Sequence, residues 1–180
     1  MTDVQKSYTT VVDFITGREV PDVGAEANRQ TIEKQLVEEK GYLKADIEVD
    51  VDMAITVAGE PYRSQIDLVV TVDGHRIMAV KCAAGSLGSR EREILAAARL
   101  LDSCQIPLAV VTDGIHAIVL DTVSGKKIGE GMTAIPSKEK ARDLLAASTP
   151  LAFPEKKRER EMLVFRTYDL ENVNVHRKIT

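Results

Sequence analysis

One hairpin constrains this chain more than any other stretch. Residues 66–72 and 75–82 are rich in β-branched and apolar side chains, and Asp73-Gly74 between them suits a tight turn with positive φ. Because side chains alternate across a strand, the pattern predicts two sets that each share a face: Asp67, Val69 and Thr71 on the first strand, and Ile77, Ala79 and Lys81 on the second. A buried carboxylate and a buried lysine are costly unless they pair or serve a function. The hairpin therefore predicts either an Asp67–Lys81 salt bridge or a functional site.

The flanking segments predict an α/β fold. Helix formers predominate over residues 23–40, and Gly41 is well placed to end that helix. Residues 46–57 alternate, which predicts a half-buried strand with one apolar face: Ile47, Val49, Val51, Met53, Ile55 and Val57. After the hairpin, residues 90–103 predict a helix, residues 106–112, 115–122 and 126–129 predict short strands, and residues 136–147 predict a last core helix.

The length of 180 residues suits one core domain with extensions. We expect an N-terminal arm over residues 1–22, packed on the core or on a second subunit, a domain over residues 23–147, and a linker with a helical tail over residues 148–180. The charged run EKKRERE predicts a solvated helix, whose Lys156, Lys157, Arg158 and Arg160 either contact phosphates or help to dock a partner. The sequence shows neither a membrane span nor a signal peptide pattern, so a cytoplasmic protein is expected.

The net charge of −4 argues against strong non-specific DNA binding, because neutralised phosphates supply most of that affinity. An acidic metal site and one basic groove can nevertheless coexist on one surface.

The order helix, three strands, helix, strand resembles the core of the PD-(D/E)xK nucleases. More closely, residues 23–145 resemble the N-terminal nuclease-like domain of type I restriction enzyme R subunits. The segments that carry this resemblance are GAEANRQTIEKQLVEEKGY, YRSQIDLVVTVDGHRIMAVKC and IPLAVVTDGIHAIVLDTVSGKKIG. The resemblance implies a restriction-endonuclease-like α/β core with antiparallel or mixed strands, extra strands and C-terminal helices.

The same resemblance implies a site for Mg²⁺ or Mn²⁺. Asp67 would bind the metal with the Val80 backbone carbonyl, Glu26 on the first helix would support the metal or its water, and Lys81 would orient the nucleophile. Glu33 is the second choice for the helix acid. A solvated glutamate on an amphipathic helix is the simpler interpretation of Glu26.

This sequence departs from the family pattern at position 79, where the family has a second metal-binding carboxylate and this chain has alanine. A substitution introduced on purpose, a natural loss of activity, and a carboxylate supplied by Glu91 or Glu93 are three open explanations. A second departure lies on the following helix, where Glu93 and Ala97 stand near positions at which related proteins often have Gln and Tyr.

The expected function is that of a metal-dependent DNA endonuclease, impaired by Ala79. The alternative is a non-catalytic module that binds nucleic acid or protein and retains only the nuclease fold. DNA is the expected partner, with a homodimer or docking to a larger restriction or motor subunit as further expectations. Substituting Ala79 by glutamate is expected to place a second carboxylate beside Asp67 and to create or restore cleavage.

Overall fold

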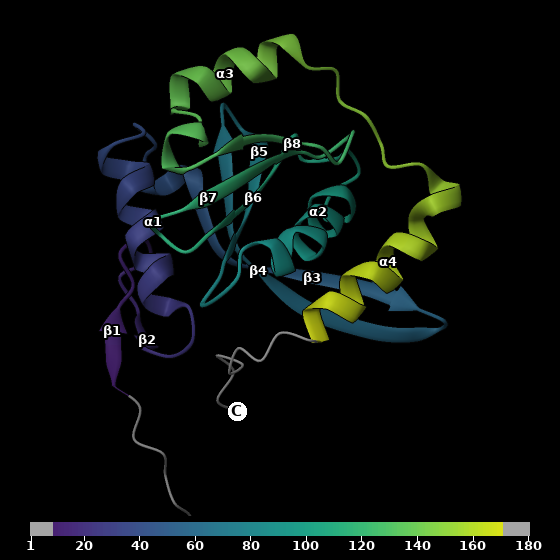
Figure 1. Ribbon diagram of the computed structural model, residues 1–180, viewed down its shortest axis with the longest axis horizontal. Helices are drawn as coiled ribbons and strands as arrows, with labels where there is room; N and C mark the ends of the chain where they lie inside the picture. The colour runs from purple at the N-terminus through teal and green to yellow at the C-terminus, as the bar shows by residue number, and fades with distance from the viewer. Residues whose placement is uncertain (1–8, 171–180) are drawn as a thin grey trace, which may run out of the picture.

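A computed structural model describes residues 9–170 of the chain. Its centre is a six-stranded mixed sheet in the order β3-β4-β5-β6-β7-β8 (Figure 1). The strands are β3 (Ile47–Val57), β4 (Glu60–Val72), β5 (His75–Cys82), β6 (Leu108–Thr112), β7 (Ala117–Asp121) and β8 (Lys127–Glu130). Only β5 and β6 pair in parallel, and they are joined through α2 (Glu91–Leu100). The predicted α/β class and the mixed sheet are confirmed.

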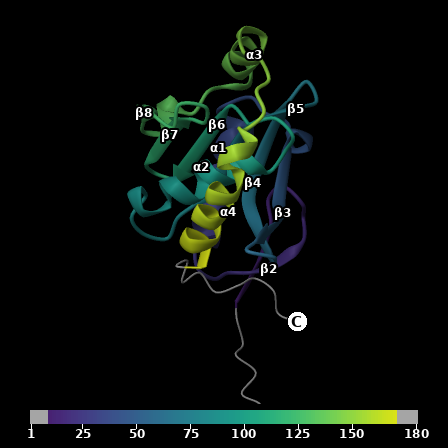
Figure 2. The same cartoon turned by 90° about the vertical axis from the view of Figure 1, so that its right-hand side faces the viewer.

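Helices cover both faces of the sheet, and each face has its own apolar core. On one face, α1 (Glu26–Glu38) contributes Ile32 and Leu36, and α3 (Lys138–Ala147) contributes Ala141. On the other face, α2 contributes Ile94 and α4 (Glu155–Leu170) contributes Phe165. Figure 2 shows α4 lying across α2 and β4 on this second face. No helix within residues 9–170 is long and apolar enough to cross a membrane.

The predicted β4–β5 hairpin is present. Asp73 and Gly74 have φ angles of 50° and 81°, as a two-residue turn of the predicted kind requires. At the end of the hairpin away from the turn, Leu68 pairs with Val80. One detail of the prediction is wrong: a bulge between Val70 and Thr71 shifts the register, and Ile77 packs in the α1-side core.

The apolar face predicted for residues 46–57 is also wrong in part. Ile47 and Val49 pack in the α1-side core, whereas Met53, Ile55 and Val57 pack in the α2-side core. The change occurs at Asp50, which adopts a φ of 52° and interrupts the regular β3–β4 pairing between Val49 and Val51. A left-handed residue rotates the strand beyond it, so strict alternation does not hold across the whole strand.

The N-terminal arm, described from residue 9, packs on the core. β1 (Thr10–Val12) and β2 (Glu19–Pro21) form a small antiparallel hairpin beside α1 (Figure 1). The Phe14 N–H donates to Oε1 of Gln30 at 2.8 Å. Residues 1–8 and 171–180 of the predicted arm and tail lie outside the described residues.

The C-terminal segment is part of the fold. Residues 155–170 form one helix whose charged residues Lys156 and Lys157 are exposed, as predicted for a solvated helix. Its Phe165 is fully buried and meets the Tyr62 ring edge-on at 6.4 Å between centroids. The domain boundary at residue 147 stays a prediction.

Candidate functional site

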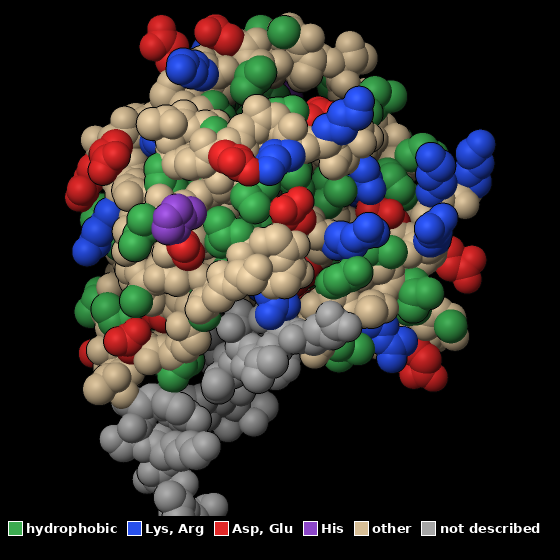
Figure 3. Space-filling view, in the orientation of Figure 1, with side chains coloured by type: hydrophobic (Ala, Val, Ile, Leu, Met, Phe, Trp, Pro, Cys, Tyr) green, Lys and Arg blue, Asp and Glu red, His purple; other side chains and the backbone are tan. Residues whose placement is uncertain are grey.

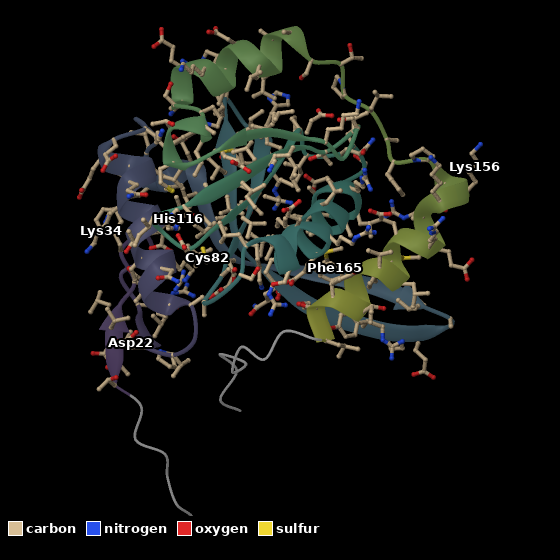
Figure 4. The ribbon with its side chains drawn as sticks, in the orientation of Figure 1. Asp22, Lys34, Cys82, His116, Lys156 and Phe165 are labelled. Carbon is tan, nitrogen blue, oxygen red and sulfur yellow. The ribbon has the colours of Figure 1, made fainter. Side chains whose placement is uncertain are left out.

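Three side chains of opposite charge meet at the carboxyl end of β5. Lys81 Nζ lies 3.0 Å from Glu93 Oε1 and 3.7 Å from Asp67 Oδ2. The side chains of Asp67, Lys81 and Glu93 are 14%, 7% and 4% exposed. The end of β5 is marked in Figure 4 by Cys82, which follows Lys81. We call these three residues the Lys81 cluster.

The strand register brings the cluster together. Asp67 precedes Leu68 and Lys81 follows Val80, so in the two antiparallel strands they occupy the next opposing positions beyond the Leu68–Val80 pair. Beyond that pair Asp67 Oδ2 accepts a hydrogen bond from the Cys82 N–H at 2.7 Å, so the carboxylate is held by the backbone of β5. Glu93 comes from the first turn of α2, on the side of that helix that faces the sheet. The sequence expectation that Asp67 and Lys81 face each other is therefore met in the structure.

Burial and charge oppose one another in the cluster. Burial alone would lower the pKa of Lys81, but the Asp67 and Glu93 carboxylates outweigh it and hold the pKa above its usual range. For Glu93 the balance is reversed. Burial raises the pKa of Glu93, and the charge of Asp169 raises it further, which together outweigh the lowering by Lys81 and Arg90. The cluster thus combines a charged lysine with a carboxyl group whose pKa is raised.

The last turn of α4 lies next to the cluster. The Tyr62 hydroxyl donates to Asp169, and Arg90 Nη1 donates to the Tyr168 carbonyl at 3.4 Å. The Arg166 guanidinium carbon lies 5.7 Å from the centre of the Tyr62 ring. Burial raises the pKa of Tyr62, and the bond to Asp169 raises it further. The hydroxyl is therefore a neutral hydrogen-bond donor near the cluster.

Glu26 belongs to a second, fully buried charged group on α1. Its Oε1 accepts from Arg29 Nη2 at 2.6 Å and from Gln30 Nε2 at 2.7 Å. Arg29 also pairs with Asp13 at 2.7 Å and with Glu33 at 2.8 Å. Glu26 and Glu33, the two helix acids proposed from the sequence, are thus joined through one guanidinium.

The two charged groups lie at the same end of the sheet. Asn28 Nδ2 donates to the Ala83 carbonyl at 2.7 Å, so the start of α1 meets the end of β5. Against the effect of burial, Glu26, Glu33 and Asp50 raise the pKa of Arg29. Asp50 lies in β3 between the residues that pair with Leu68 and Ile66, across the ladder from Asp67. This places Glu26 at the same end of the sheet as the Lys81 cluster.

Ala79 and Val80 occupy the interior of the sheet. Ala79 is fully buried in the α2-side core, with Val69 and Ala109 beside it on the neighbouring strands. Val80 pairs with Leu68 on one side and Val110 on the other. A carbonyl in the middle of a sheet generally accepts a ladder hydrogen bond, so Val80 is a poorer metal ligand than the carboxylates nearby.

The donor set fits a weakly held Mg²⁺ or Mn²⁺. Asp67 and Glu93 supply two carboxylates that both lie near Lys81 Nζ, and Mg²⁺ commonly uses one or two protein carboxylates and keeps several waters. Within residues 9–170 no group of three or more His, Cys, Asp or Glu side chains is arranged to hold a metal ion. The fit is therefore that of a two-carboxylate site.

Some of this arrangement had no clear signal in the sequence. Glu93 was one of two candidates for a replacement carboxylate, and the choice between it and Glu91 needed the helix phase. Asp13 and Arg29 carried no motif, although two acids spaced three and four residues from an arginine indicate a local charge group. Tyr62 and Asp169 are 107 residues apart and meet only through the docking of α4.

Comparison with known proteins supports the predicted relationship. The family model described as type I restriction enzyme R protein N terminus matches residues 24–136, which is more than half of the chain. Neither the curated proteins nor the solved structures contain a match. The matched stretch runs from the residues before α1 to those before α3, and it includes Asp67, Lys81 and Glu93. The resemblance to type I restriction enzyme R subunits noted from the sequence is confirmed, and the chain belongs to the family of type I restriction enzyme R protein N-termini.

Proposed function

We propose that this chain is a metal-dependent nuclease domain in which Glu93 of α2 takes the place of the carboxylate missing at position 79. One observation carries the proposal: Lys81 Nζ lies between Asp67 at 3.7 Å and Glu93 at 3.0 Å at the end of the central hairpin. A metal ion held by carboxylates can polarise a phosphate and activate a water molecule, and a lysine can offset the negative charge that develops. In this proposal DNA is the substrate.

Each residue has a distinct role. Asp67 and Glu93 would hold Mg²⁺ or Mn²⁺, which would polarise the phosphate and activate a water molecule. Glu26 would support this site through its neighbour Arg29 and through Asp50. Lys81 keeps its proton and would offset the negative charge that develops on the phosphate. The hydroxyl of Tyr62 is a further donor at the edge of the cluster.

The test compares two glutamates in the first turn of α2. Glu93→Gln removes the carboxylate that contacts Lys81, and Glu91→Gln makes the same change on the same turn, away from that contact. We expect Glu93→Gln and Asp67→Asn to lower plasmid cleavage in Mn²⁺ by about 100-fold or more, as loss of a charge-stabilising group does. Glu91→Gln should cleave like the unchanged chain.

Calorimetry of Mn²⁺ binding gives a readout that does not depend on cleavage. Asp67→Asn and Glu93→Gln should each weaken Mn²⁺ binding, and Glu91→Gln should not. Equal Mn²⁺ affinity in the Glu93 and Glu91 variants would contradict the assignment of Glu93.

A non-catalytic module is the second candidate, and one observation favours it. All three side chains of the Lys81 cluster are nearly buried and paired, so the cluster also suits a structural ion pair beneath α4. In that case the unchanged chain would neither bind Mn²⁺ nor cleave DNA, and Glu93→Gln would only lower its stability.

A further inference from the structure

We propose that a basic cavity between α2 and α4 binds the phosphate backbone of a nucleic acid. The cavity has a volume of about 420 Å³, within the range of ligand sites. Its lining includes four cationic side chains and one carboxylate: Arg92, Arg99, Lys157, Arg160 and Glu161. The chain as a whole has a net charge of −4, so this concentration of positive charge is local.

The helix phases explain the concentration. Arg92 and Arg99 lie on one face of α2, seven residues apart, while Lys157, Arg160 and Glu161 lie on one face of α4. These two faces meet where α4 packs against α2, and the ion pair between Arg99 and Glu161 joins them. Figure 3 shows blue Lys and Arg side chains gathered on the right of the molecule, where α4 lies. Lys156, at the start of α4, is labelled on this side in Figure 4.

The Arg99 side chain lines the cavity and is held in place by its contacts. Its Nη1 lies 2.8 Å from Glu161 Oε1, and its Nε donates to the Thr122 carbonyl at 3.0 Å. Its guanidinium carbon lies 5.5 Å from the centre of the Phe153 ring, which also lines the cavity. The one carboxylate of the lining is therefore neutralised by Arg99.

The other three cations are available to a ligand. Arg92, Lys157 and Arg160 are exposed, and no side-chain hydrogen bond or ion pair engages them within the described part of the chain. Like charges held together without partners repel one another, and a polyanion relieves that repulsion. Arginine and lysine on a groove are the usual means of following a phosphate backbone, with gains from counterion release.

This surface goes beyond the proposed reaction, because none of its lining residues belongs to the Lys81 cluster. Lys157 and Arg160 also lie outside the stretch matched by the family model. Binding is measured without divalent metal, so a failed cleavage assay leaves this proposal standing, and a failed binding assay leaves the Glu93 assignment standing.

The experiment uses fluorescence anisotropy of the full chain with labelled single-stranded and duplex 20-mers in EDTA at several NaCl concentrations. The test variant carries Arg92→Gln, Lys157→Gln and Arg160→Gln. The control variant carries Arg18→Gln, Lys34→Gln and Lys140→Gln, which remove the same charge at exposed positions elsewhere. Lys34 is labelled on α1, at the opposite side of Figure 4 from Lys156.

With three phosphate contacts, the slope of log affinity against log salt should be about −2 for the single strand and about −3 for the duplex. The test variant should bind about 10- to 100-fold more weakly and show a flatter slope. The control variant should stay within about twofold and keep the slope of the unchanged chain. The single strand and the duplex identify which form the cavity prefers.

Equal losses in the test and control variants would overturn the proposal, because they would reflect net charge alone. Unchanged binding by the test variant would do the same. Tighter binding of a poly-glutamate peptide than of either 20-mer, lost in the test variant, would assign the cavity to an acidic protein partner instead.

Discussion

Substituting Phe165 by alanine tests whether α4 is an integral part of the fold. The Phe165 side chain is 0% exposed, packs in the α2-side core and meets Tyr62 edge-on. Removing a fully buried Phe side chain costs about 3–5 kcal/mol, through lost transfer free energy and the cavity left behind. For a chain of this size, each kcal/mol lowers Tm by about 2–4 °C, so the expected fall is roughly 6–20 °C.

The measurement is urea unfolding followed by circular dichroism, with calorimetry for Tm. Leu163→Ala is the matched control, because Leu163 lies two residues away on the same helix and is 53% exposed. We expect that control to change the free energy of unfolding by less than about 1 kcal/mol. A loss below about 1 kcal/mol for Phe165→Ala, or a separate early transition of α4 in the unchanged chain, would refute the view that α4 belongs to the cooperative core.

Three further predictions follow from burial, charge and backbone conformation. Ala79→Glu should lower the urea midpoint of unfolding, because the carboxylate enters an apolar core. Unchanged stability without metal would contradict this prediction. A gain in Mn²⁺ affinity would support the expectation from the sequence that a glutamate at position 79 adds a metal-binding carboxylate beside Asp67. Burial, Asp13 and Glu26 raise the pKa of Glu33 to about 7, so its folded form holds a proton that the unfolded chain releases near pH 4.5. Stability from this group is complete below about pH 4.5 and is lost as pH rises to about 7; Glu33→Gln should remove that dependence, whereas Glu38→Gln should retain it. Gly74→Ala should cost about 1 kcal/mol at a φ of 81°, and Gly85→Ala, without a positive φ, should be nearly neutral by the same unfolding assay.

Local sequence determined the central hairpin and its turn. The reason is physical: Asp73-Gly74 suits only a narrow set of turns, and a turn sets the register of the strands that it joins. That register continued by strict alternation would set Asp67 opposite Val80, and the bulge between Val70 and Thr71 shifts it by one residue, which brings Asp67 to the face of Lys81. The helices predicted for residues 23–40, 90–103 and 136–147 are present as α1, α2 and α3, each somewhat shorter than predicted. The Ser137 side chain caps α3 by accepting from the Lys140 N–H, whereas no side chain caps the start of α1 or α2.

Tertiary structure decided everything that depends on how distant elements dock. The left-handed Asp50 and the bulge at Val70–Thr71 moved apolar residues between the two cores, against strict alternation. The phase of α2 on the sheet brought Glu93 to Lys81 at 3.0 Å, and the docking of α4 brought Asp169 to Tyr62. A short sequence pattern predicts that a helix forms and which of its faces is apolar. The angle and position at which that helix packs on the sheet depend on the whole core, and they determine which side chains meet in the site.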